Sequence, residues 1–404
     1  MKKTGKMLSL VLAAAMTASL AAGCGSSSAG TTSTAAAAST EATAAGADGE
    51  VFKIGVIGPL TGGGAAYGIA VKNGAELAAA EINAAGGING YQVEILSQDD
   101  ELNSEKSVNA YNALKDQGMQ ILDGTVTSAC SIAVSELTKE DNMFQLTPSG
   151  SATDCTKYDN VFRTCFSDPQ QGVLSADLIA EKGLGTKVGI IYDNSDSYSS
   201  GIEAAFVEEA AKVGLEIVSE EAFNADNKTD FSTQLQAAKD GGAEIVFLPF
   251  YYTEASLVLQ QASNMDFSPI FFGCDGMDGI LTVENFDTSL AEGLMLMTPY
   301  SPTATDEKTQ TFVKNSEAAN GGEVPNQFGA DSYDSIYAIK AAIEAANLTP
   351  DMSVSDICDG IKGVMTEISV DGVTGSPLTW TADGEPSKAP KVYSITNGEY
   401  VEVE

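Results

Sequence analysis

The chain has 404 residues, with 56 acidic and 21 basic side chains, no histidine and a formal charge of −35. This charge, with Arg163 as the single arginine, excludes nucleic acids and anionic surfaces as partners, because they need basic patches. The lack of histidine removes the Ser-His-Asp and Cys-His triads and the commonest zinc ligand, and the cysteines show no CxxC spacing. We therefore expect no enzyme, no catalytic residue, no metal site and no cofactor.

The first thirty residues have the pattern of a secretory signal. Three lysines precede an apolar run over residues 7–22, and small residues lead to Cys24. The run is shorter than the roughly 20 residues that span a bilayer. Cys24 after small residues resembles a bacterial lipoprotein box, which implies that its thiol carries lipid; a plain signal peptide with an incidental cysteine is the alternative. We expect residues 1–23 to be removed and Cys24 to anchor the protein outside the cytoplasmic membrane, at the cell surface.

A tether follows the anchor. Residues 24–50 are Ser, Thr, Ala and Gly with almost no large apolar side chain, so they cannot bury enough surface to offset their chain entropy. The globular part is expected to begin near Val51. Its length of about 350 residues suits two domains better than one.

Short apolar runs alternate with helical patterns in the first part of the globular region. One helix, residues 68–83, carries an apolar stripe of Val71, Ala75, Ala78 and Ile82. The expected strands are 51–58, 91–97, 120–122 and 143–147, and the expected helices 68–83, 104–117 and 128–140.

The alternation then restarts with a second series. Strands are expected at 187–192, 215–222, 244–249, 269–273 and 293–297, with helices at 169–181, 201–213, 231–239 and 254–264; helices 307–320 and 328–347 follow, with short strands around Trp380 and at 391–396. Strand–helix alternation means parallel sheets with right-handed crossovers. Two series predict an α/β protein with two doubly wound lobes. Ligands bind such sheets at the carboxyl ends of the strands.

The loop over residues 58–68 contains five glycines and invites a dinucleotide interpretation. The fingerprint fails, because Tyr67 stands where its third glycine would be and no acidic residue ends the next strand at the required distance. A flexible turn is one explanation. The functional interpretation gives Tyr67 the role of covering a ligand.

Two further loops in the first lobe offer polar groups at strand ends. Ser128 is placed as the N-cap of a helix whose free N–H groups and positive dipole end would hold a small carboxylate without an arginine. Residues 147–151 add two hydroxyls directly after a strand. Helix capping alone and a plain turn explain the two loops equally well.

In the second lobe, residues 194–198, 249–252 and 273–276 each follow a strand. Asp275 lies between Gly273 and Gly276 at the end of a strand, where its carboxylate is suited to accept hydrogen bonds from an ammonium. Such charge-assisted hydrogen bonds contribute about 1.5–3 kcal/mol each. A surface carboxylate in a turn is the alternative. Cys155 and Cys165 could pair across a loop or stay buried as free thiols.

The chain resembles the leucine/isoleucine/valine-binding proteins, the branched-chain amino acid-type solute receptors of ABC importers. Residues 54–62 resemble the opening strand and loop of that family, and residues 81–90 (EINAAGGING) resemble a characteristic stretch. Residues 243–254 and 291–293 fit the second lobe. The combination is specific, whereas each piece alone is weak.

The resemblance implies a type I periplasmic binding protein fold with three hinge crossings, near residues 166–168, 298–300 and 380–388. Lobe 1 would comprise residues 51–166 plus 299–382, and lobe 2 residues 167–298 plus 383–404. It also implies a lipid-anchored monomer that captures a free amino acid, branched-chain or other small neutral, and docks on ABC permease subunits.

The same resemblance assigns roles to individual residues. Ser128 would bind the ligand carboxylate, Ser149 would contact the ammonium through its backbone carbonyl, and Ser151 would contact both ends of the amino acid. Tyr198 and Tyr251 would cover the ligand, and Tyr67 would line its side-chain end. Asp275 would neutralise the ammonium. Asp275 stands where the family often has Glu, so its reach is one methylene shorter. The alternatives are a receptor for another small solute (an amide, urea or an aromatic acid) and a ligand-sensing module of the same fold.

Overall fold

The structure is a computed structural model that describes residues 49–403. The predicted signal peptide, Cys24 and nearly all of the predicted tether lie outside the described residues. Residues 49–403 all fall in one compact unit, so the described elements can be placed relative to one another.

A first sheet is built from residues 51–163 of the described chain. All its strand pairs are parallel, in the order β2-β1-β3-β4-β5. Strand β1 is buried on both faces, with Ile54 and Val56 on one side and Ile57 on the other, which is typical of a parallel sheet covered by helices on both faces. The bounds are β1 Val51–Gly58, β2 Gln92–Asp99, β3 Ile121–Gly124, β4 Phe144–Thr147 and β5 Val161–Arg163.

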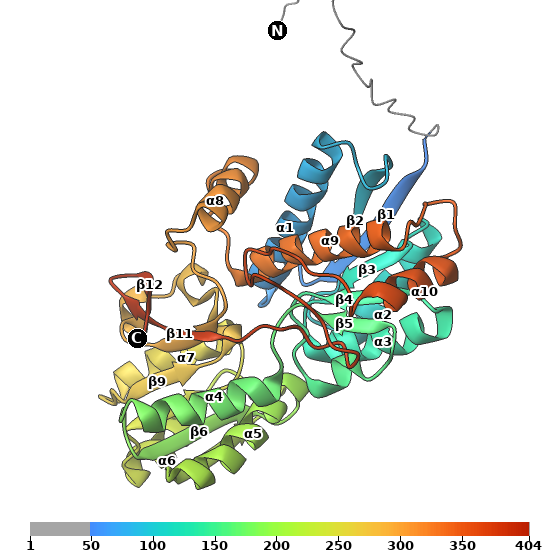
Figure 1. Ribbon diagram of the computed structural model, residues 1–404. Coiled ribbons are helices and arrows are strands. Elements are labelled where there is room, and N and C mark those ends of the chain that lie inside the picture. The colour runs from blue at the N-terminus through green and yellow to red at the C-terminus, as the bar shows by residue number, and fades with distance from the viewer. Residues whose placement is uncertain (1–48, 404) are drawn as a thin grey trace, which may run out of the picture. The chain divides into compact units, whose positions relative to one another are not determined.

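Helices cover both faces of this sheet. Helix α1 packs against α9, and α2 packs against α3 (Figure 1). The predicted stripe of α1 is confirmed, since Val71, Ala75, Ala78 and Ile82 are all buried in one core cluster with β1. The bounds are α1 Ala65–Ala84, α2 Ser104–Asp116, α3 Ser128–Asp141, α8 Glu307–Ala319, α9 Gln327–Ala345 and α10 Val354–Val364.

The second sheet, in residues 187–402, repeats the topology of the first. Its order is β12-β11-β10-β9-β8-β6-β7, and the part from β7 to β10 is parallel with the same strand sequence as the first sheet. Strands β11 and β12 extend one edge in antiparallel pairing. The bounds are β6 Lys187–Asp193, β7 Glu216–Phe223, β8 Ile245–Leu248, β9 Ile270–Gly273, β10 Met295–Thr298, β11 Lys391–Thr396 and β12 Glu399–Glu402.

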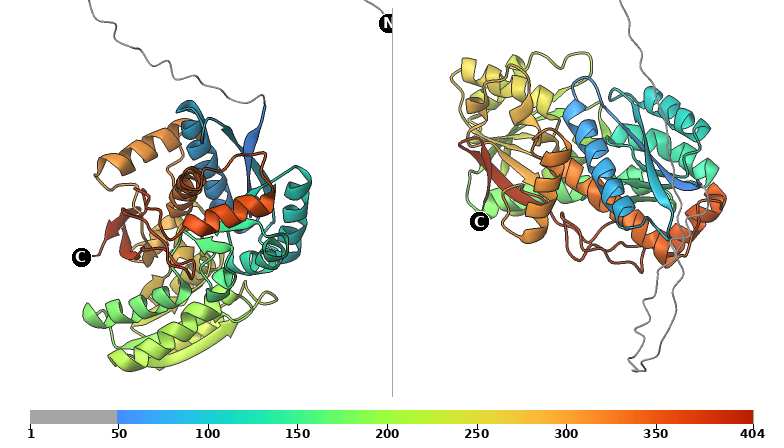
Figure 2. Two further views of the ribbon diagram at one scale, coloured as in Figure 1. Left: turned by 45° about the vertical axis from the view of Figure 1, so that its right-hand side comes forward. Right: turned by 90° about the horizontal axis from the view of Figure 1, so that it is seen from above.

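Four helices and several short 3₁₀ turns belong to this second series. Figure 2 separates its green and yellow elements from the blue and cyan elements of the first series. The bounds are α4 Asp168–Glu181, α5 Ser197–Val213, α6 Ser232–Gly241 and α7 Tyr252–Asn264, with 3₁₀ turns at Asp275–Met277, Ile280–Thr282 and Thr288–Ala291; a further 3₁₀ turn, Thr153–Thr156, belongs to the first series. The predicted α/β fold with two doubly wound sheets is therefore confirmed.

Some sequence-based expectations were incomplete or wrong. The strand expected around Trp380 does not form among the described residues: Trp380 makes only an isolated bridge with Pro386, which has no N–H to continue a ladder. Strands β5 and β12 and helix α10 were not expected. The two strands are very short, but α10 has a local signal, because Ser353 caps it and its apolar residues follow a helical spacing.

The chain passes between the two sheets after β5, after β10 and before β11. These places lie near the three expected crossings. The residue bounds of the two lobes stay a prediction.

Candidate functional site

The predicted loops meet between the carboxyl ends of the two sheets. Six of the seven predicted ligand-binding residues line one cavity of about 20 Å³, together with four residues that were not predicted. Apart from Phe328 of α9, they come from the segments that follow β1, β3 and β4 in the first sheet and β6, β8 and β9 in the second. The cavity is lined by Tyr67, Val126, Thr127, Ser128, Ser149, Tyr198, Tyr251, Asp275, Gly276 and Phe328.

Ser128 does not have the predicted capping position. Thr127 is the N-cap of α3, without a side-chain capping bond in the described chain, and Ser128 is the first helical residue. The Ser128 hydroxyl instead accepts hydrogen bonds from the backbone N–H groups of Ser151 (3.2 Å) and Ala152 (3.1 Å). This leaves the start of α3 facing the cavity, where its free N–H groups suit a carboxylate.

The loop after β4 supports the same side of the cavity. Ser149 lines the cavity and donates its hydroxyl to the carbonyl of Val126 at 2.6 Å. Ser151 does not line the cavity; it is buried behind Ser128, which its backbone N–H contacts. The structure therefore brings Ser149 to the site and places Ser151 in the layer behind it.

Asp275 is the charged group of the cavity. It is 4% exposed, and its Oδ1 accepts a hydrogen bond from the Tyr198 hydroxyl at 2.6 Å. Burial raises the pKa of Asp275 to about 6, while the hydrogen bond from Tyr198 favours the ionised form. The Asp275 carboxyl group is thus shielded from water, and a cation bound next to it would favour its ionised form.

Aromatic rings enclose the remaining sides. Tyr198 and Tyr251 stack with ring centroids 5.1 Å apart, and Tyr67 meets the ring of Phe328 edge-on at 4.8 Å. The Tyr67 hydroxyl donates to the carbonyl of Gly276 at 2.5 Å, a contact from the first series of elements to the second. Burial raises the pKa of all three tyrosines well above its usual value, so they act as neutral hydrogen-bond donors.

The sequence interpretation missed Val126, Thr127, Gly276 and Phe328. The first three are neighbours of predicted residues, so the loops themselves were the signal. Phe328 lies in the first turn of α9, far along the chain, and no local pattern connects it with the cavity.

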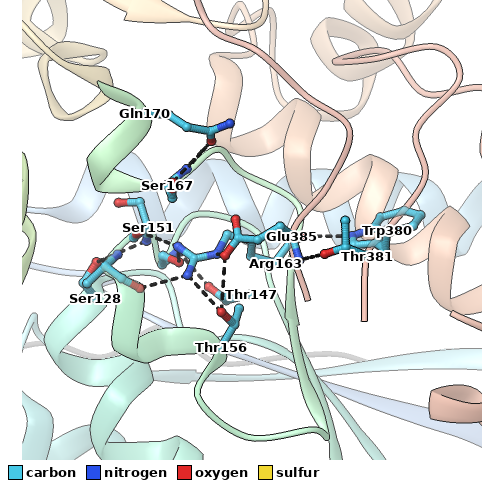
Figure 3. A network of polar contacts seen from close by, with 12 residues as sticks. Ser128, Thr147, Ser151, Thr156, Arg163, Ser167, Gln170, Trp380, Thr381 and Glu385 are labelled. Atoms are coloured by element: carbon cyan, nitrogen blue, oxygen red, sulfur yellow. Dashed lines mark hydrogen bonds and ion pairs between the residues drawn. The ribbon is translucent and has the colours of Figure 1, made fainter. Parts of the chain in front are cut away.

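Arg163 supports the site from behind (Figure 3). Its guanidinium is buried and donates to the carbonyls of Gly150, Ser151 and Ala152, and it pairs with Glu385 at 3.1 Å. The loop that it holds is the one whose N–H groups fix Ser128. Arg163 thus connects the cavity with the segment that precedes β11.

A larger hollow of about 610 Å³ lies beyond Tyr252, between the start of α1 and residues 282–284. Its walls are mainly apolar, amide and glycine residues, and no set of polar groups from strand ends converges on it. The smaller cavity is therefore the better candidate site, because it combines strand ends, a helix N-terminus and a buried charge.

Other kinds of site find no support in residues 49–403. This part of the chain contains no group of three or more Cys, Asp or Glu that could hold a metal ion. Its five cysteines are buried and free, so Cys155 and Cys165 do not pair. Across the same residues, no helix is long and apolar enough to cross a bilayer.

Comparisons with known proteins bear on the family and the fold. Residues 51–399 match the model of a family described as periplasmic binding protein. A Leu/Ile/Val-binding protein homologue of Brucella melitensis is 32% identical over 302 residues, which cover 74% of this chain and 80% of the relative. The crystal structure of a leucine-binding protein from Thermotoga maritima matches with a TM-score of 0.79 at 26% identity, covering 88% of this chain and 98% of the other. A branched-chain amino acid substrate-binding protein from Streptococcus pneumoniae, solved with isoleucine, matches with a TM-score of 0.78 at 28% identity. The match covers 88% of this chain and 100% of the other.

Proposed function

The chain belongs to the periplasmic binding protein family, and from this premise we propose that it is the extracytoplasmic substrate-binding component of an ABC importer for a free amino acid. The named relatives are Leu/Ile/Val-binding proteins, and one neighbouring structure holds isoleucine. The relatives are binding proteins, and we propose that this chain likewise binds its ligand without changing it chemically. Its partners would be the permease subunits, and it would act as a monomer.

The observation that carries the proposal is the pairing of opposite polarities across one small cavity. The start of α3 with Ser128 supplies N–H groups for a carboxylate, and Asp275 supplies a negative charge for an ammonium. The two ends of a zwitterion would bind them at once. Tyr67, Tyr251 and Phe328 would surround a small neutral side chain, which favours a branched-chain or similar amino acid.

A ligand screen tests this function. The purified protein, residues 25–404, is mixed with each of the twenty amino acids and with acetamide, urea and benzoate, and its thermal unfolding is measured. A bound amino acid raises the unfolding temperature by mass action. A shift with benzoate or urea and none with any amino acid would replace the proposal with a receptor for a different solute.

Closure of the two lobes is the expected mode of binding. The cavity of about 20 Å³ has room for about one water molecule, so an amino acid requires the walls to separate first. Each sheet supplies part of the wall, and a ligand favours the closed form by its differential affinity for it. We expect a smaller radius of gyration in X-ray scattering with saturating amino acid than without it. Identical curves would indicate a rigid preformed site.

Binding should also depend on pH through Asp275. An ammonium favours the ionised carboxylate, whereas below the pKa of about 6 the free protein must first lose the proton. The affinity is therefore expected to fall about tenfold between pH 7 and pH 5. Calorimetry at several pH values measures it, and the dependence should be weaker in the Asp275→Asn variant. A fall of the same size in that variant would assign the dependence to another group.

The anchor is a separate part of the proposal, and it rests on the sequence around Cys24. We propose that a lipid on this thiol holds the protein at the outer face of the membrane. Cys24→Ala should leave the precursor uncleaved or release the protein into the medium, as fractionation and immunoblotting would reveal. A variant as fully processed and membrane-bound as the natural protein would disprove the anchor.

A further inference from the structure

A second buried carboxylate lies next to the residues that hold the cavity wall. Asp168 is the first residue of α4 and is 1% exposed. Within residues 49–403, neither of its carboxylate oxygens makes a hydrogen bond of acceptable geometry. The Ser151 hydroxyl and the Gln171 Nε2 are equally unpartnered in this part of the chain, and both residues are at most 1% exposed.

Helix capping does not explain Asp168. Ser167 and Gln170 form a capping box at the start of α4, in which the Ser167 N–H donates to Gln170 Oε1 at 2.9 Å (Figure 3). This box already satisfies the groups that a helix start exposes. A carboxylate one residue later would gain only from the helix dipole, which is a small effect compared with its burial.

An ion pair with Arg163 does not explain it either. The guanidinium donates to the carbonyls of residues 150–152 and to the Thr156 hydroxyl, and its Nε lies 3.1 Å from Glu385. No contact between Arg163 and the Asp168 carboxylate occurs among the described residues at ion-pair distance. Arg163 therefore lowers the pKa of Asp168 only through space, without a direct ion pair, and burial, which raises this pKa, outweighs it.

The position of Asp168 places it between two walls of the cavity. Its backbone N–H donates to the carbonyl of Ser151 at 2.9 Å, and the N–H of Ser151 holds Ser128. On the other side, Gln171 Oε1 accepts the N–H of Asp275 at 3.0 Å. Helix α5 packs closely over the carboxylate, since a Cβ at Gly201 would lie only 3.0 Å from Asp168 Oδ2.

We propose that Asp168, with the Ser151 hydroxyl and the Gln171 side chain, forms the second half of a subsite for a primary ammonium, in the layer directly behind the residues that line the cavity and next to the half that Asp275 forms. The inference rests on the proposed function and extends it, because it makes an ammonium group, rather than a carboxylate alone, the feature that selects the substrate class. Burial raises the pKa of Asp168 well above its usual range, and the charge of Asp275 adds to this. A cation bound beside the two carboxylates lowers both pKa values and so opposes these effects.

The test measures selectivity for the amino group. The probes are the amino acid that binds most tightly in the screen above and the 2-hydroxy acid with the same side chain; for L-leucine this is 2-hydroxy-4-methylpentanoic acid. In Asp168→Asn, the affinity for the amino acid should fall about 10- to 100-fold, because a charge-assisted hydrogen bond to the ammonium is lost. The affinity for the 2-hydroxy acid should stay the same or rise. Direct and displacement calorimetry give both values.

Stability without ligand separates this role from a structural one. Asp168→Asn removes an uncompensated buried carboxylate, so its unfolding temperature should be unchanged or higher. The control is Asp334→Asn: Asp334 is equally buried, but its carboxylate accepts the N–H groups of Val373 and Thr374 and the Thr374 hydroxyl. That variant should unfold at a lower temperature and keep the natural selectivity.

Equal losses for both probes in Asp168→Asn, or a lower unfolding temperature of that variant, would overturn the inference and leave the proposed function intact. Absence of binding by all twenty amino acids would overturn the proposed function and this inference together.

Discussion

Replacing Asp275 by alanine should weaken amino acid binding by about 2–4 kcal/mol, or roughly 30- to 900-fold. Asp275 is the charged residue of the cavity lining; it is buried, and its Oδ1 accepts a hydrogen bond from the Tyr198 hydroxyl. Without it, the ammonium of a bound amino acid would be desolvated without its main counter-charge. Calorimetry at pH 7 measures the loss.

Two companion variants sharpen this result. Asp275→Asn keeps the size of the side chain and removes its charge, so it should lose most of the same affinity. Asp287→Ala is the control, since this carboxylate caps a 3₁₀ turn at residues 288–291 and does not line the cavity. Unchanged affinity in Asp275→Ala, or a preferred ligand without an amino group, would contradict the assignment.

Replacing Lys388 by alanine should destabilise the protein by about 3–5 kcal/mol. Lys388 is buried, and its ammonium pairs with Asp331 and donates to the Thr374 hydroxyl at 2.5 Å. Truncation leaves the buried Asp331 carboxylate without its cation. Urea unfolding followed by circular dichroism measures the change in the free energy of unfolding.

An exposed ion pair provides the control for that experiment. Lys340 pairs with Glu344 one helical turn away on α9, and Lys340→Ala should cost no more than about 0.5 kcal/mol. The double variant Lys388→Met, Asp331→Leu replaces the buried pair by apolar groups and should recover most of the stability. A loss below about 1 kcal/mol in Lys388→Ala would mean that the pair is hydrated in solution.

The buried ion pair of Lys388 and Asp331 also bears on function. Lys388 and Thr374 lie in the segment that precedes β11, and Asp331 lies on α9, which also carries Phe328 of the cavity. Asp334, one turn further along α9, holds the same segment through Val373 and Thr374. The third passage of the chain between the sheets is thus tied to the helix that forms one wall of the site.

Much of the fold could be predicted because its signals are local. Strand–helix alternation predicted two parallel sheets, and the strands β1 and β11 have the predicted bounds. The same order located the loops after β3, β4, β6, β8 and β9, because parallel strands all present their carboxyl ends on one side. Ser128, Ser149, Tyr198, Tyr251 and Asp275 were found in this way.

Long-range packing decided the rest. Phe328 reaches the cavity only because α9 packs on α1, and Ser151 lies behind Ser128 rather than in the lining. The charge states of Asp168 and Asp331 depend on which side chains are buried around them, and those neighbours come from distant segments. Periodicity and turn residues report on a few neighbours along the chain. The sequence by itself therefore determined the sheets and the edge that carries the site, whereas only the tertiary structure decided which groups meet there and which buried charges are left without a partner.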